Sequence, residues 1–238
     1  MMFRIIFNFF ILKRNIVIFL FSFSYYTCQS TELKQKVLFY SINTDFHFIE
    51  KKILRLEIFK RIPFKNLKNQ ILISYDYCDS LENCYSSNNK SYSIDSHQEI
   101  TGMINDEKKI WMHPPRDNYF RILELNAFPY FIENEKKWRY IVTFGEEWGN
   151  EKWLQWKGYK TTLTNYEKED KFFTYRLDNK DILCYKIQAT TMIYDTGTTK
   201  STFLYSPEYG FVFMRFETIN GKYLEFNLVK TIYDSNSK

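Results

Sequence analysis

Apolar and polar residues alternate in three separate segments of this chain, and this pattern constrains the fold more than any other feature. The segments are residues 54–58, 71–75 and 223–228. Successive side chains of a β-strand point to opposite faces of a sheet, so a period of two predicts half-buried strands. Beyond residue 30 the best helix candidate is residues 146–156, but it contains Gly149 and is flanked by Gly145 and Gly158. The sequence therefore predicts an all-β fold.

The C-terminal third of the chain shows the pattern most clearly. Its strand candidates are Phe172–Leu177, Ile182–Tyr194, Ser201–Ser206, Phe211–Thr218 and Lys222–Thr231. Short turn sequences separate them, and Asn220-Gly221 favours a type I′ hairpin, which needs two residues that tolerate positive φ. Turns this close together predict an antiparallel meander. We expect a single curved antiparallel sheet, closing partway into an unclosed β-barrel.

The first thirty residues have the composition of a secretory signal peptide. Arg4, Lys13 and Arg14 precede a short apolar run, and small residues follow it. The run is too short for a membrane anchor, which needs about twenty apolar residues. Residues 1–30 are predicted to be the signal peptide, and residues 31–238 one β domain. Export would take the protein to the periplasm, the outer envelope or the exterior.

Two kinds of processing remain open at the end of this leader. Cleavage after Ser30 places small residues, Cys28 and Ser30, at the positions that a signal peptidase requires. Alternatively, Cys28 becomes the lipidated first residue of a lipoprotein, although Thr27 and Tyr25 fit that rule poorly. Only the lipidated form would be held at a membrane.

The charge balance gives no electrostatic case for a nucleic-acid partner. The chain has 33 Lys and Arg, and removing the three in the leader leaves 30 against 28 Asp and Glu. The mature domain is thus nearly neutral, and its charges are mixed along the chain, as on solvated strand faces. Aromatic residues make up 20% of the sequence, which favours pleated sheet.

Several C-terminal motifs resemble a known group of proteins. They are Cys-Tyr-x-Ile-x-Ala at 184–189, Phe-x-Tyr-Ser-Pro-x-x-Gly-Phe-Val at 203–212 and the terminal strand around Gly221. The Trp-Met-His-Pro-Pro-Arg block at 111–116, followed by Phe120–Leu125, looks like a hydrophobic strand pair of the same group. The group comprises bacterial exported half-barrel proteins, which are unclosed β-barrels related to periplasmic lipoprotein carriers. The resemblance covers roughly residues 110–230 and implies a sheet wrapped around an apolar interior, but no family binding residue maps onto this chain.

The cysteines suggest one disulfide. Cys78 and Cys84 flank a short polar segment, and in an oxidising compartment they would form a bridge. The alternative is two free, partly buried thiols. Cys184 lies among apolar residues in a predicted strand, so we expect a buried, inert thiol. The histidines, His47, His97 and His113, are far apart in sequence, and we predict neither a metal site nor a cofactor.

Two motifs allow an enzymatic or glycan-binding interpretation. Trp148, Trp153 and Trp156 lie close to Glu146, Glu147 and Glu151. They could form a sugar-stacking platform or supply glycosidase acids, but tryptophans more often pack in a core. Asp195-Thr196-Gly197 matches the aspartic-protease tripeptide, yet the chain has no second copy and a hairpin turn explains it equally well.

The hypothesis that these patterns favour is an exported, non-catalytic protein that binds an apolar or amphiphilic ligand, or a protein partner. The pocket would lie on the concave face of the sheet. Its candidate lining residues are Phe211, Phe213, Leu224, Phe226 and Leu228, with Trp148, Trp153 and Trp156 as further candidates. The alternatives are a carbohydrate-active or peptide-hydrolysing enzyme and a glycan-binding module. His113 could act as an acid or base or as a pH sensor, but its place before Pro114-Pro115 better fits the end of a strand.

Overall fold

The computed structural model describes residues 34–63, 65, 67, 69–86, 99–106, 108–116, 120–145, 147–150 and 154–233. All of them belong to one compact unit, Glu32–Lys238. The predicted leader, and Cys28 with it, lies outside the described residues. Its processing therefore stays a prediction.

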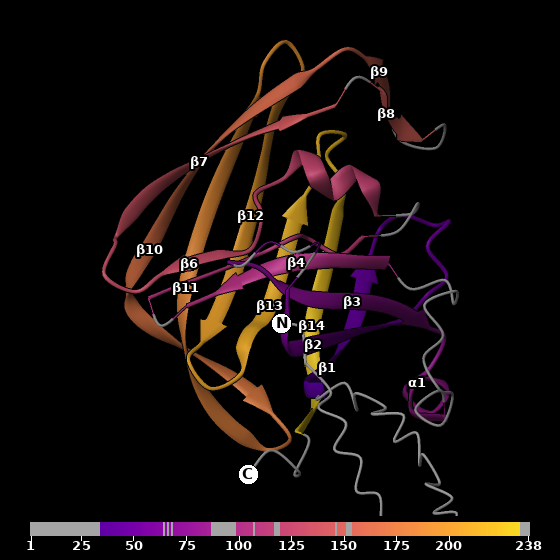
Figure 1. Ribbon diagram of the computed structural model, residues 1–238, viewed down its shortest axis with the longest axis vertical. Coiled ribbons are helices and arrows are strands. Elements are labelled where there is room, and N and C mark those ends of the chain that lie inside the picture. Colours follow the sequence, from indigo (N-terminus) through magenta and orange to yellow (C-terminus); the bar gives the residue numbers. More distant parts are fainter. Residues whose placement is uncertain are drawn as a thin grey trace, which may run out of the picture. The chain divides into compact units, whose positions relative to one another are not determined.

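Twelve strands form one antiparallel sheet that curls into an open half-barrel, as the sequence predicts (Figure 1). Its first six strands are β1 (Lys34–Thr44), β2 (Ile53–Pro63), β3 (Ile71–Cys78), β4 (Glu99–Asn105), β5 (Lys109–Met112) and β6 (Tyr130–Ile132). The other six are β7 (Lys137–Phe144), β10 (Lys160–Leu177), β11 (Lys180–Ile193), β12 (Gly197–Ser206), β13 (Gly210–Glu217) and β14 (Tyr223–Tyr233).

The sheet consists of two meanders joined by the first and last strands of the unit. Its order is β6-β5-β4-β3-β2-β1-β14-β13-β12-β11-β10-β7. At the centre, β1 pairs antiparallel with β14, for example Leu38 with Thr231 and Ile42 with Phe226. The two outer strands, β6 and β7, are consecutive in the chain, so a turn of four residues connects opposite edges of the sheet.

The hairpins of the second meander follow the predicted boundaries closely, but two details differ. β10 begins at Lys160, well before the predicted start at Phe172. At Asn220-Gly221 only the glycine has a positive φ, +76°, so the turn is not the predicted type I′, which requires two. Asp178 and Asn179, between β10 and β11, both have positive φ. The tight two-residue turn lies there instead.

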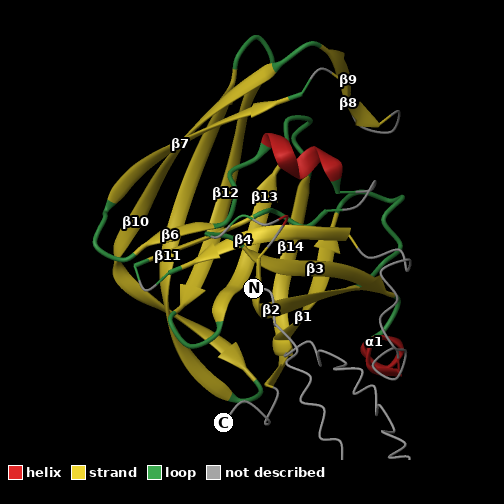
Figure 2. Ribbon diagram, viewed as in Figure 1, coloured by secondary structure: helices red, strands yellow, loops and turns green. Residues whose placement is uncertain are grey.

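Two segments adopt structures that the sequence did not predict. The helix candidate at 146–156 contains a two-stranded ribbon, β8 (Glu147–Asn150) and β9 (Leu154–Lys157). Glycines disfavour a helix there, since they carry the largest entropy cost of ordering. The predicted second strand at Phe120–Leu125 is instead the 3-10 helix η3 (Arg121–Leu125), drawn in red in Figure 2.

Residues 120–129, called the plug below, contain η3 and pack into the core of the half-barrel. Phe120, Ile122, Leu123, Leu125, Ala127 and Phe128 are all buried. Asn126 Nδ2 donates to the carbonyls of Lys200 (3.1 Å) and Glu217 (2.9 Å), and Tyr166 donates to Phe128 O (2.9 Å). The half-barrel is therefore packed along part of its concave face by its own chain.

Aromatic side chains bridge the seam between the two edge strands. Tyr130 of β6 lies 6.0 Å from Trp138 and 5.7 Å from Tyr140 of β7, between ring centroids. Trp138 in turn stacks on Tyr166 at 5.3 Å. Within the described residues no backbone pairing joins β6 to β7, so side chains hold these edges together in place of a ladder.

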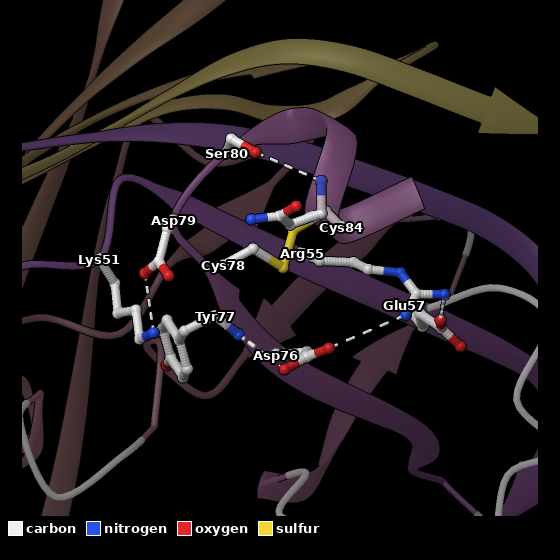
Figure 3. The surroundings of a disulfide bond; sticks show 10 residues. Lys51, Arg55, Glu57, Asp76, Tyr77, Cys78, Asp79, Ser80 and Cys84 are labelled. Atoms are coloured by element: carbon white, nitrogen blue, oxygen red, sulfur yellow. Dashed lines mark hydrogen bonds and ion pairs between the residues drawn. A yellow bond between two sulfur atoms is a disulfide. The ribbon is translucent and has the colours of Figure 1, made fainter. Parts of the chain in front are cut away.

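The outer face of the sheet carries the helix α1 (Leu81–Ser86), tied down by the predicted disulfide between Cys78 and Cys84 (Figure 3). The two Cα atoms are 5.6 Å apart, within the usual range for a disulfide. Cys84 packs with Val37, Phe39 and Ile53 in a small apolar cluster. The disulfide thus holds α1 over this cluster.

Replacing both Cys78 and Cys84 with alanine should lower the free energy of unfolding by about 2 kcal/mol, because a short cross-linked loop restricts the unfolded chain only modestly. Urea denaturation under non-reducing conditions measures this loss. A reductant should produce a similar loss in the wild type and none in the double variant. Equal stability of the oxidised and reduced wild type would contradict the prediction.

Candidate functional site

A pocket of about 360 Å³ lies inside the half-barrel, beyond the region that the plug fills. It is lined by residues from β1, β2 and β4–β6 on one side and from β11–β13 on the other. These strands come from both halves of the sheet order, so the pocket exists because the sheet curls until its halves face each other.

The floor of the pocket is apolar and largely aromatic. Its buried residues are Leu38, Tyr40, Leu56, Met103, Met112, Phe131, Tyr205 and Phe211. Phe131 stacks on Tyr205 with ring centroids 4.1 Å apart, and Tyr205 contacts Phe211 edge-on at 5.3 Å. The Tyr40 hydroxyl donates to Phe211 O at 2.8 Å, which satisfies a buried polar group.

The rim of the pocket is polar. Asn105, Asp106, Glu133, Pro207 and Glu208 are exposed there. Asp106 stabilises the turn that follows it, because its carboxylate accepts hydrogen bonds from the backbone N–H groups of Lys108 (3.0 Å) and Lys109 (2.9 Å). These hydrogen bonds from backbone N–H groups lower the pKa of Asp106.

Two half-buried lysines, Lys36 and Lys168, lie close to this rim. Lys36, half-buried on β1, donates to Glu208 O at 2.9 Å and lies 5.8 Å from the ring centroid of Tyr209. Burial lowers the pKa of Lys36 to about 8, although Glu208 acts in the opposite direction. Lys168 of β10 lies 5.2 Å from the ring centroids of both Phe131 and Tyr185. Burial also lowers the pKa of Lys168.

Only some of the residues that the sequence suggested as pocket lining do line the pocket. Phe211 does line the pocket. Leu224, Phe226 and Leu228 share one inward face, as expected, but they are at most 1% exposed and lie in the filled core. The ring centroid of Phe226 lies 5.8 Å from that of Phe120 in the plug. Phe213 is half-buried and does not line the pocket.

A β-bulge explains why Phe211 and Phe213 differ. Leu204 pairs with Phe213, but Tyr205 pairs with Phe211, so Val212 is an extra residue on β13. A one-residue shift moves side chains to the opposite face of a sheet. Phe211 consequently faces the interior with Met214, whereas Phe213 faces the other side.

Among the other sequence candidates, neither Asp195 nor Cys184 lines this pocket. Trp148 and Trp156 pair through their backbones in β8 and β9, while Trp153 and Glu146 lie outside the described residues. Asp195 is exposed in the turn between β11 and β12, with φ of +56°. Cys184 is buried, as predicted, and burial raises the pKa of its thiol to about 11.

His113 follows β5 and packs against aromatic rings. Its ring centroid is 5.3 Å from Trp111 and 4.9 Å from Phe128, and its carbonyl accepts from the Tyr75 hydroxyl at 2.6 Å. Burial, together with the nearby charge of Arg116, lowers the pKa of His113 to about 4. The ring is therefore neutral at physiological pH.

In the described part of the chain, no three His, Cys, Asp or Glu side chains gather as a metal site would require. No described helix has the length and apolar character needed to cross a membrane.

Sequence reasoning did not single out most of the pocket. Lys36, Tyr40, Phe131, Tyr185 and Tyr205 come from four different strands, β1, β6, β11 and β12. One local signal was available, because Lys36 shares the inward face of β1 with Leu38 and Tyr40. A lysine on an otherwise apolar strand face is unusual, since Lys is rarely buried without a partner.

No protein-family model matches the chain, and no curated protein matches it. Among solved structures, it is similar to the hypothetical lipoprotein YmcC from Escherichia coli (K12), with 10% identity and a TM-score of 0.42 over 84% of this chain and 88% of that one. It is also similar to a candidate exported protein with a YmcC-like fold from Bacteroides fragilis, with 10% identity and a TM-score of 0.42 over 84% and 96% of the two chains. A candidate lipoprotein from Parabacteroides distasonis has 9% identity and a TM-score of 0.40 over the same shares. These are bacterial proteins of the kind that the C-terminal motifs resemble.

Proposed function

We propose that this protein is an exported, non-catalytic binding protein that holds a small apolar or amphiphilic ligand in the pocket of its half-barrel. The observation that carries the proposal is a concave site with a buried aromatic and aliphatic floor and a polar rim. Small-molecule sites typically have this construction, and 360 Å³ lies near the lower end of the roughly 300–1,000 Å³ range for ligand pockets.

Two further observations support the proposal. The leader-like residues 1–30 and the disulfide between Cys78 and Cys84 both suit an oxidising compartment outside the cytosol. The carboxylates at the pocket, Asp106, Glu133 and Glu208, are all exposed on the rim. Carboxylates in such positions lack the buried, converging arrangement of catalytic acids.

Filling the pocket should weaken ligand binding. Ile58 lines the pocket and is only half-buried, so Ile58→Trp would place an indole in the cavity with little strain on the core. We expect the variant to bind dodecan-1-ol at least about tenfold more weakly than the wild type, because the tail loses its apolar contacts. Displacement of the fluorescent probe N-phenyl-1-naphthylamine measures the affinity.

Phe213→Trp is the matched control, since Phe213 is equally half-buried but does not line the pocket. Its affinity for dodecan-1-ol should equal that of the wild type. Circular dichroism would verify that both variants are folded. Failure of the wild type to bind either probe, or equal binding by Ile58→Trp, would overturn the proposed function.

A further inference from the structure

We infer that the ligand of this pocket is a single-tailed amphiphile whose head group is an anion, held at the rim by Lys36, with Lys168 close to the lining residues Phe131 and Tyr185. This inference rests on the proposed function and adds the chemical class of the ligand. It follows from the placement of charged groups around an apolar cavity.

The two lysines differ from ordinary surface lysines in their surroundings. Lys36 reaches the pocket from the same strand face as the buried Leu38 and Tyr40, next to the ring of Tyr209. Lys168 lies over Phe131 and Tyr185, both lining residues, and donates to the carbonyls of Ile132 (3.2 Å) and Glu133. Each ammonium group contacts aromatic rings and backbone carbonyls, so each loses part of the hydration that a fully exposed lysine keeps.

The lowered pKa of each lysine agrees with this geometry. For both, desolvation outweighs the attraction of neighbouring carboxylates. An anion placed at the rim would restore favourable charge around these ammonium groups, and charge-assisted hydrogen bonds are stronger than neutral ones.

The acidic residues at the rim occupy a different position. Asp106, Glu133 and Glu208 are exposed and hydrated, and Asp106 is further committed to Lys109, 3.7 Å away, and to the amides of its turn. Both lysines are therefore more buried than these carboxylates. A ligand whose apolar tail lies on the pocket floor would place its head group near the ammonium group of Lys36.

The volume of the pocket limits the tail. At about 360 Å³ the space suits one alkyl chain better than the several chains of a complex lipid. The probes are therefore ligands with one twelve-carbon tail and different head groups: dodecanoate, monododecyl phosphate, dodecan-1-ol and dodecyltrimethylammonium.

We expect dodecanoate or monododecyl phosphate to bind about tenfold more tightly than dodecan-1-ol, and dodecyltrimethylammonium to bind most weakly. The anion that binds more tightly shows whether the site prefers a carboxylate or a phosphate head group. Lys36→Met should remove most of the advantage of the anions while leaving dodecan-1-ol within about twofold, because the methionine keeps the apolar stem. Lys36→Arg, the charge-conserving control, should retain that advantage.

A pH series gives a second readout that does not depend on a substitution. The affinity for dodecanoate should fall as the pH rises through about 8, where Lys36 loses its proton, and the fall should be smaller in Lys36→Arg. The other titratable or charged groups that face this region are Asp106, Glu133, Glu208, Tyr40, Tyr185, Tyr205, Tyr209 and Lys168. Affinity for dodecan-1-ol should not follow this pH dependence.

The outcomes separate the two proposals. If dodecan-1-ol binds and Ile58→Trp blocks it, but anions gain nothing and Lys36→Met changes nothing, the head-group inference is wrong and the proposed function stands. If no tailed probe binds the folded wild type, both fail. Tighter binding of dodecyltrimethylammonium than of dodecanoate would show that the rim carboxylates select the ligand instead.

Discussion

Changing Phe120 to alanine should lower the free energy of unfolding by about 3–5 kcal/mol, the usual cost of emptying a buried aromatic position. Phe120 is 1% exposed and stacks on Tyr77, with ring centroids 4.8 Å apart. It also contacts Phe226, so its side chain joins the plug to the sheet on two sides. Urea denaturation followed by circular dichroism measures the loss.

Phe172→Ala is the control for this experiment, because it removes the same atoms from a phenylalanine that is 57% exposed. We expect it to cost less than about 1 kcal/mol. A loss in Phe120→Ala no larger than that of Phe172→Ala would contradict the interpretation that residues 120–129 belong to the folding core.

Acid should destabilise the protein through His113 before most carboxylates are protonated. The folded pKa of about 4 lies below the unfolded value of 6.5, so between these pH values the unfolded chain binds more protons. The contribution of His113 is fully present above about pH 6.5 and is lost as the pH falls towards 4. The loss reaches about 3 kcal/mol at most, since each pKa unit corresponds to about 1.4 kcal/mol.

His113→Phe isolates this contribution, because phenylalanine keeps a ring between Trp111 and Phe128 but cannot take up a proton. Unfolding free energies measured from pH 7.5 to 4 should fall less steeply in this variant than in the wild type. His47→Gln, which removes an exposed histidine, should retain the wild-type slope. Parallel curves for His113→Phe and the wild type would refute the assignment.

Local sequence patterns predicted much of the sheet. The alternation of residues 54–58 and 223–228 corresponds to strands β2 and β14, and Leu224, Phe226 and Leu228 do share a buried face. The short polar segment between Cys78 and Cys84, together with the expected export, also predicted their disulfide. These features depend on residues close together in the chain, where side-chain alternation and turn chemistry act directly.

The candidate site was predicted less completely, and β13 shows the reason. Alternation alone places Phe211 and Phe213 on the same face, but a single bulge at Val212 separates them. Whether a strand contains a bulge depends on the partner strand as well as on its own sequence. Phe211 therefore lines the pocket and Phe213 does not, although the two are indistinguishable by residue type and spacing.

The sequence by itself determined the strand periodicity, most hairpins of the C-terminal meander and the short disulfide loop. Tertiary structure decided the pairing of β1 with β14, the insertion of residues 120–129 as a plug and the meeting of Lys36, Phe131 and Tyr205 around one cavity. Pairing β1 with β14 joins residues nearly 200 positions apart, as in Lys36 with Tyr233. Such contacts become favourable only when the whole sheet curls and buries its apolar face, because loop-closure entropy opposes each of them alone.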